Sequence, residues 1–427
     1  MNARAMLALA VSAVLLIVPW LLPSFYVGIF AYAGIYALGA SGLVLLLQAG
    51  QISLGQGAFM GLGAYGSALV ARAYGVDTLL TLVGSVAVTA LIGAVIGFIT
   101  LRLRGHYLPL ATLAYGIALF GVFNAWHDVT GGASGLDKIP PLVLLGYEMT
   151  DDRVYTQLIW VIVLLAVLGL SRLRTSRTGR AIATLEAHDG MARACGVDTT
   201  VLRVKVFVFS VALAALAGAL YVHLLRFGSP SPFSLLTSFK LLIMAVVGGP
   251  MSAAGGVVGA LTLESAQWTL QDILARWGLS GNLEVIVFGV ILVVMLLKWP
   301  QGLWPAVEKI LPRPALRSRE GEGLTRTSLT EDRNEVLLRL EGIGIRFGGL
   351  QALEGIEMEL RRGEFVGLIG PNGAGKTTLF SIISGLQRET SGRVTLFGDR
   401  LPASHKIVRR GMARTFQHVQ LVPELSV

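Results

Sequence analysis

The stretch Gly370-Pro371-Asn372-Gly373-Ala374-Gly375-Lys376-Thr377-Thr378 decides how the C-terminal part of this 427-residue chain folds. It fits the phosphate-loop pattern G-x-x-x-x-G-K-[ST]. The apolar run 365–369 before it predicts a buried strand, and residues 378–383 after it predict a helix. A strand, a glycine-rich loop and a helix in this order predict an α/β nucleotide-binding domain.

Each part of this loop has a predicted role in holding a nucleotide. The glycines let backbone N–H groups converge on phosphate oxygens, and the positive end of the following helix adds to the anion site. Lys376 is predicted to reach the β- and γ-phosphates, and the hydroxyl of Thr377 to ligate Mg²⁺. ATP and Mg²⁺ are therefore the predicted cofactors.

The composition places the rest of the chain in a membrane. Hydrophobic residues make up 54% and charged residues 14% of the chain, and the mean hydropathy is +0.68, which excludes an average soluble protein. The net charge of +9 comes from basic residues beside apolar runs, as anionic lipid headgroups favour. We therefore predict the lipid bilayer as a partner and no nucleic acid.

Apolar runs predict an α-helical polytopic membrane domain of about ten transmembrane helices. The third and eighth runs are short or interrupted by glycine, so eight spans with two re-entrant segments are an alternative. The runs are 6–22, 27–47, 58–73, 79–101, 108–125, 155–170, 206–224, 241–247, 254–270 and 285–297.

Basic residues give the predicted orientation. The loop 172–205 is rich in Arg and Lys, whereas acidic residues dominate the loop 126–153, so the first is predicted to be cytosolic and the second external. Counting spans from these loops puts both termini and the nucleotide-binding part in the cytosol, with the chain multi-pass in the cytoplasmic (inner) membrane.

The predicted domains follow from a change in composition after Pro305. Residues 1–305 form the membrane domain, residues 306–335 a polar linker with a basic start, and residues 336–427 a partial α/β P-loop ATPase domain. Alternating residues near Leu338 and Leu360 predict strands of an antiparallel subdomain before the phosphate loop.

Two further residues are candidates for the nucleotide site. Phe347 precedes the loop at a distance that would let its ring cover an adenine, although core packing is the alternative. Gln417 follows a predicted strand end, where its amide could ligate Mg²⁺ and touch the attacking water; the alternative is a satisfied loop glutamine.

The run from Phe347 to Leu353, the phosphate loop and Thr415-Phe416-Gln417 together resemble the cassette ATPase of ABC transporters, in particular the ATP subunit of the branched-chain (hydrophobic) amino-acid importers. The resemblance implies that Phe347 stacks on adenine, that residues 370–378 are Walker A and that Gln417 is the Q-loop glutamine. It covers about the first 90 residues of a cassette. The catalytic motifs follow later in that family, so we predict no catalytic residue here and expect hydrolysis only with a complete cassette or a partner.

The membrane part resembles the permease of the same importers. The similar stretches are 51–59, 63–65, 103–107, 111–113, 130–136, 248–251 and 300–303. Their glycines let backbones approach or unwind around a cavity for a small amino acid; helix packing alone is the alternative.

The basic cytosolic loop is similar to the permease loop that docks on the ATPase. Its predicted coupling residues are Arg180, Asp189, Ala192 and Gly196, although such a loop can also be only a topology anchor. Within the spans, Glu264 is either a functional intramembrane charge or a residue near the outer headgroups.

These features predict a permease fused to part of a cassette ATPase, which imports branched-chain amino acids or a related small amino acid or amide. The resemblance implies a second permease subunit, cassette ATPase subunits and an external solute-binding protein as partners. Two alternatives are an ABC exporter half-transporter and a non-catalytic permease whose vestigial cassette relies on a separate ATPase.

Overall fold

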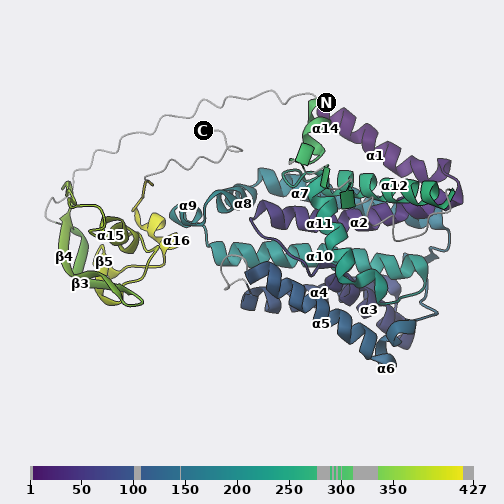
Figure 1. The fold of residues 1–427 in the computed structure, drawn as a ribbon, viewed down its shortest axis with the longest axis horizontal. Coiled ribbons are helices and arrows are strands. Elements are labelled where there is room, and N and C mark those ends of the chain that lie inside the picture. Colours follow the sequence, from purple (N-terminus) through teal and green to yellow (C-terminus); the bar gives the residue numbers. More distant parts are fainter. Residues whose placement is uncertain are drawn as a thin grey trace. The chain divides into compact units, whose positions relative to one another are not determined.

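The computed structural model describes residues 3–100, 107–144, 146–276, 289–290, 293–294, 297–299, 301–310 and 335–416. The chain divides into two units (Figure 1). The first is formed by Met1–Ala183 and Thr200–Pro314, and the second by Thr184–Thr199 and Ala315–Val427.

The first unit is built from helices, with one small hairpin of β1 (Val143–Leu144) and β2 (Tyr147–Glu148) among its described residues. Nine of the predicted apolar runs lie in helices, whereas the tenth, 285–297, lies mostly outside the described residues. The long helices are α1 (Ala3–Leu21), α2 (Ser24–Gln48), α3 (Gln56–Tyr74), α4 (Thr78–Thr100), α5 (Tyr107–Ala125), α7 (Asp152–Thr175), α10 (Thr199–Leu225), α11 (Leu235–Gly248) and α12 (Gly255–Arg276). Shorter helices are α6 (His127–Thr130), α8 (Arg177–Ala187) and α14 (Trp304–Ile310), with 3₁₀ turns η1 (Gly132–Ser134) and η2 (Ser231–Phe233).

Five of the described helices are long and apolar enough to cross a membrane: α2, α4, residues 108–125 of α5, α7 and α10. Residues 9–21 of α1 and the whole of α11 are shorter apolar helices. On α4, large apolar side chains such as Val83, Leu91 and Phe98 are exposed, as expected for a face that meets lipid acyl chains. The helical membrane domain predicted from the sequence is therefore present.

Helix α2 forms the centre of the first unit. Nearly all of its residues from Ala31 to Leu46 are buried, and it packs against α7, α11 and α12. A helix that is apolar all round has no face suited to water, so burial on every side is its stable arrangement.

Several helices approach so closely that only glycine fits at the contact, and two of these contacts are among the tightest between long helices. A Cβ on Gly218 of α10 would overlap the Met60 carbonyl of α3, and a Cβ on Gly259 of α12 would overlap the Met244 carbonyl of α11. Van der Waals contact between backbones replaces the hydrophobic effect as the attraction between helices in lipid. The glycines near residues 57–63 and 248–259 thus pack helices together.

The second unit contains a four-stranded antiparallel sheet with the order β4-β3-β5-β6. Its strands are β3 (Val336–Phe347), β4 (Leu350–Arg361), β5 (Ser391–Leu396) and β6 (Asp399–Arg400). The β3–β4 hairpin agrees with the predicted antiparallel subdomain. Leu340, Ile343 and Val394 of the sheet form a buried cluster with Leu379 and Ile382 of α15 (Lys376–Ile383). The remaining elements are α9 (Asp189–Ala194), α16 (Ser404–Ile407) and η3 (Val408–Arg410).

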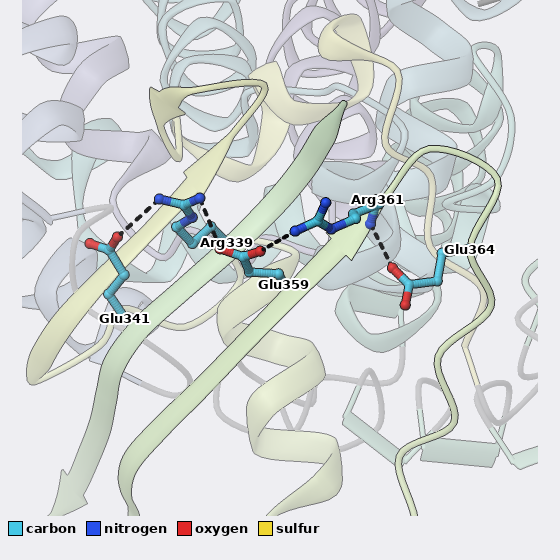
Figure 2. Close-up of polar contacts among 5 residues, drawn as sticks. All are labelled: Arg339, Glu341, Glu359, Arg361 and Glu364. Carbon is cyan, nitrogen blue, oxygen red and sulfur yellow. Dashed lines mark hydrogen bonds and ion pairs between the residues drawn. The ribbon is translucent and has the colours of Figure 1, made fainter. Parts of the chain in front are cut away.

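Ion pairs cross the exposed face of the β3–β4 hairpin (Figure 2). Arg339 lies 2.8 Å from Glu359 and 3.8 Å from Glu341, while Arg361 lies 3.4 Å from Glu359. The backbone N–H of Arg361 donates to Glu364 at 2.8 Å. All these side chains are substantially exposed, so each pair contributes little to stability.

The predicted buried strand at 365–369 is wrong. These residues form no strand, and Phe365 and Ile369 are 103% and 95% exposed. A strand needs a neighbour to accept its hydrogen bonds, and within the described residues the antiparallel sheet offers no parallel partner for this run. The helix predicted after the loop is confirmed as α15.

Candidate nucleotide site and coupling segment

The phosphate loop is exposed and leads directly into α15. Gly373 and Gly375 have φ values of +87° and +83°, a left-handed conformation that disfavours residues with a Cβ. Gly375 precedes the first turn of α15, in which Lys376 and Thr377 lie. The loop therefore brings a helix N-terminus, a lysine and a threonine hydroxyl together, which fits a phosphate group and its Mg²⁺.

The lysine is held by its own loop. The Lys376 ammonium donates to the Gly370 carbonyl at 2.6 Å and to the Pro371 carbonyl at 2.7 Å. A carbonyl oxygen is an uncharged acceptor, whereas a phosphate oxygen carries charge and makes stronger bonds. Lys376 can therefore leave the carbonyls for a phosphate without losing hydrogen bonding.

The predicted adenine-stacking residue, Phe347, lies on the four-stranded sheet of the second unit. Phe347 ends β3, is 47% exposed and is absent from the buried cluster of the second unit. The loop reaches this sheet at β4, because a Cβ on Gly375 would lie 2.6 Å from the Leu353 side chain. The stacking role of Phe347 stays a prediction.

A groove of about 680 Å³ begins beside the loop. Its lining includes Lys376, Thr377, Arg414 and Thr415, together with apolar side chains such as Phe380. The Arg414 guanidinium donates to the Ser384 hydroxyl at 2.6 Å, and partial burial lowers its pKa from the ordinary value. The predicted Mg²⁺ ligand Gln417 lies outside the described residues.

Three of the four predicted coupling residues lie together in the second unit. Asp189 begins α9 and pairs with Arg193 at 2.9 Å, Ala192 is fully buried, and Gly196 follows the helix with a φ of +86°. Arg180 lies instead in α8 within the first unit, where it donates to the Thr175 carbonyl at 3.3 Å.

Within the second unit, α9 packs against α16. His405 of α16 lies 3.7 Å from Asp198, and the ring of His188 lies 5.8 Å from the ring of Phe416. His188 also caps α9, because its Nδ1 accepts from the Met191 N–H at 3.2 Å. The sequence suggested a docking loop here, but it did not single out His188 or His405.

Polar contacts that the sequence did not predict also lie among the membrane helices. Gln56 is buried and donates to the Ser210 hydroxyl, and the Gly57 N–H donates to the Ser238 hydroxyl at 2.9 Å. Glu264 is 2% exposed and forms an ion pair with Lys240, which had no predicted role. The sequence gave a signal for Glu264 as an intramembrane acid and for Gln56 and Gly57 through the permease-like stretch 51–59, but not for their partners.

Comparisons with known proteins give two matched regions. The family described as branched-chain amino acid transport system / permease component matches residues 25–296, and the family described as ABC transporter matches residues 353–427.

Relatives fall into the same two groups. The high-affinity branched-chain amino acid transport system permease protein LivM of Salmonella typhimurium is 29% identical over 314 residues, which cover 67% of this chain and 71% of the relative. LivM of Escherichia coli is 28% identical over 313 residues, covering 67% and 70%. The high-affinity branched-chain amino acid transport ATP-binding protein LivG of Salmonella typhimurium is 46% identical over 96 residues, covering 22% of this chain and 38% of the relative.

Proposed function

We propose a function from the premise that this chain belongs to the family of permease components of branched-chain amino acid transport systems. Its role is transport across a membrane, as part of an ABC transporter. The proposal is that the transporter imports branched-chain amino acids or a related small amino acid into the cytosol. The observation that carries it is the presence, in one chain, of a permease domain and a phosphate loop at Gly370–Thr378.

The proposed nucleotide site uses the loop as described. Backbone N–H groups at the start of α15 and the Lys376 ammonium hold the phosphates of ATP, and the Thr377 hydroxyl ligates Mg²⁺. Phe347 covers the adenine face. Bound ATP supplies the free energy for transport through its hydrolysis, in a site completed by further cassette sequence or a partner ATPase subunit.

The proposed coupling path runs through residues 184–199. This segment packs with α16 in the second unit, and the chain continues from it into α10 of the membrane domain. Asp189, Ala192 and Gly196 shape the segment, so a shift of α16 would be passed to α10 as a rigid-body movement. Arg180 of α8 is the fourth proposed coupling residue.

The proposed assembly contains a second permease subunit, cassette ATPase subunits and an external solute-binding protein that delivers the amino acid. The chain is multi-pass in the cytoplasmic membrane, with both termini and the ATPase part in the cytosol. The basic loop 172–205 and the acidic loop 126–153 support this orientation.

Uptake of radiolabelled leucine tests this function. Right-side-out vesicles from cells that produce the chain with its partners should accumulate leucine when ATP is supplied inside, and Lys376→Ala should abolish accumulation. If leucine loaded into right-side-out vesicles leaves them when ATP is supplied inside, and none is taken up, the exporter alternative is correct. Full uptake by the K376A variant would show that a separate ATPase drives a non-catalytic permease.

A further inference from the structure

A buried ion pair lies between two membrane helices. The Lys240 ammonium of α11 lies 2.5 Å from the Oε1 atom of Glu264 on α12, and the Glu264 side chain is only 3% exposed. Glu264 stands near the middle of α12 (Gly255–Arg276), so it is far from both ends of that helix. The pair therefore sits within the helix bundle, where charges are costly and rare.

Burial of this pair needs a reason beyond stability. Removing two charges from water costs several kcal/mol per ion, and apolar side chains of similar size would often hold two helices together as well. α11 and α12 already touch closely at Gly259 and the Met244 carbonyl. The charges are thus unnecessary for joining these helices.

Aromatic side chains from two more helices surround the pair. Lys240 lies over the Tyr36 ring of α2, 4.6 Å from its centroid. Tyr32 lies one turn earlier on α2, and its ring centroid is 5.8 Å from that of Tyr221 on α10. Cation–π contact with a tyrosine face stabilises an ammonium group out of water. Four helices therefore contribute to one cluster.

The cluster has unused hydrogen-bonding capacity. An ammonium has three donors and a carboxylate accepts at both oxygens. Among the described residues, Lys240 and Glu264 have only each other as ion-pair partners, and the pair joins the ammonium to a single carboxylate oxygen, Oε1. The Lys240 side chain is 23% exposed and both α2 tyrosines are partly exposed, so a small ligand can reach the pair from the lysine side.

We propose that Lys240 and Glu264 bind the zwitterionic head group of the transported amino acid. This inference rests on the proposed function and names the residues that recognise the cargo. The carboxylate of the amino acid binds the Lys240 ammonium, and the ammonium of the amino acid binds the Glu264 carboxylate. Tyr36 keeps its ring against the Lys240 ammonium. One ion pair is exchanged for two, so the cluster stays neutral with and without the ligand.

This site selects a class of cargo. A ligand that carries one charge leaves the opposite member of the pair buried and unpaired, which is strongly unfavourable. A neutral amide or urea offers no charge to either residue. The Lys240–Glu264 site therefore restricts transport to zwitterionic amino acids. The side chain of the transported amino acid would contact the surrounding apolar helices.

The test measures leucine uptake in right-side-out vesicles containing the chain and its transporter partners. The variants are Lys240→Met, Glu264→Gln and the double variant with both changes. Each should lower uptake at least 10-fold at equal amounts of chain in the membrane. Asp272→Asn is the matched control, because Asp272 lies on the same helix and forms an exposed pair with Arg276. D272N should transport as the unmodified chain does.

The double variant distinguishes two roles of the pair: binding of the amino acid, and an ion pair that only holds α11 and α12 together, here called a clamp. A clamp between α11 and α12 would be restored when both charges are removed, since no charge is then left unpaired. Recognition would not be restored. In the unmodified chain, excess 4-methylpentanoate or 3-methylbutylamine, which each lack one charge, should compete with leucine at least 10-fold more weakly than valine does.

Two results would decide against the proposal in different ways. Leucine uptake by the double variant at half or more of the unmodified rate overturns the head-group site and leaves the import function standing. Absence of uptake of any amino acid by the unmodified transporter overturns the import function, and the site with it.

Discussion

The ammonium nitrogen of Lys376 lies 2.6 Å from the carbonyl oxygen of Gly370, at the opposite end of the same phosphate loop. The side chain thus folds back over its own loop, which is predicted to bind the phosphates of a nucleotide. Loss of this lysine removes a charge-assisted contact to phosphate, which is worth about 1.5 to 3 kcal/mol. We expect K376A to weaken binding of a fluorescent ATP analogue to the purified full chain by about 10- to 100-fold.

Arg388→Ala is the control for this prediction. Arg388 is an exposed cation in the same unit and lies outside the loop. R388A should bind the analogue as the unmodified chain does. Equal affinities of the K376A and unmodified chains would contradict a phosphate-binding role for the loop.

The contact between Gly218 and the Met60 carbonyl predicts that α10 tolerates no larger residue at this position. Gly218→Ala would force α10 away from α3, and overpacking of this kind costs about 1 to 3 kcal/mol. The apparent melting temperature of the full chain in detergent should fall by several degrees.

Gly169→Ala on α7 is the matched substitution, because a Cβ there would meet nothing within 4 Å. It should leave the melting temperature unchanged or raise it slightly. A G218A chain as stable as the G169A chain would show that the α3–α10 approach is looser than described.

Burial of Ala192 predicts a variant that separates nucleotide binding from transport. Ala192→Leu adds volume at a buried position of α9, a helix that packs against α16 and is separate in sequence from the phosphate loop. We expect ATP-analogue affinity to stay within about twofold of normal and leucine uptake to fall about 10-fold or more, since coupling needs a fixed contact. Cys195→Leu, at an exposed position just after α9, should retain uptake. Normal uptake by A192L would exclude α9 from the coupling path.

The sheet of the second unit provides a comparison between a core residue and a surface ion pair. Ile343 is fully buried, whereas Glu359 is partly exposed beside Arg339. Ile343→Ala should cost about 2 to 5 kcal/mol and Glu359→Gln less than about 1 kcal/mol. Hydrogen exchange of the full chain should therefore speed up across β3 and β4 in I343A and change little in E359Q. Similar acceleration in both variants would mean that the ion pairs of Figure 2 matter more than their exposure implies.

The membrane helices could be predicted from the sequence because their signal is local. A run such as 79–101 is apolar along its whole length, and α4 occupies nearly the same residues. The helix after the phosphate loop was predictable for a similar reason, since the loop pattern places a helix directly after the glycines, although α15 begins at Lys376, two residues before the predicted start.

Contacts between distant residues could not be predicted in this way. The run 365–369 has the composition of a buried strand, but a strand depends on a neighbour that composition does not reveal. Lys240 and Glu264 stand on different helices, so only their packing shows that they pair. Likewise, nothing in the sequences of α9 and α16, which lie about 200 residues apart, indicates that the two helices pack together.

The membership of residues 184–199 in the second unit has a consequence for synthesis of the chain. The ribosome makes α9 roughly 200 residues before it makes α16, and at about 5 to 20 residues per second this interval lasts on the order of 10 to 40 s. During that time α9 lacks its partner α16 while α10, α11 and α12 are synthesised. Final assembly of the second unit is therefore late in the synthesis of the chain.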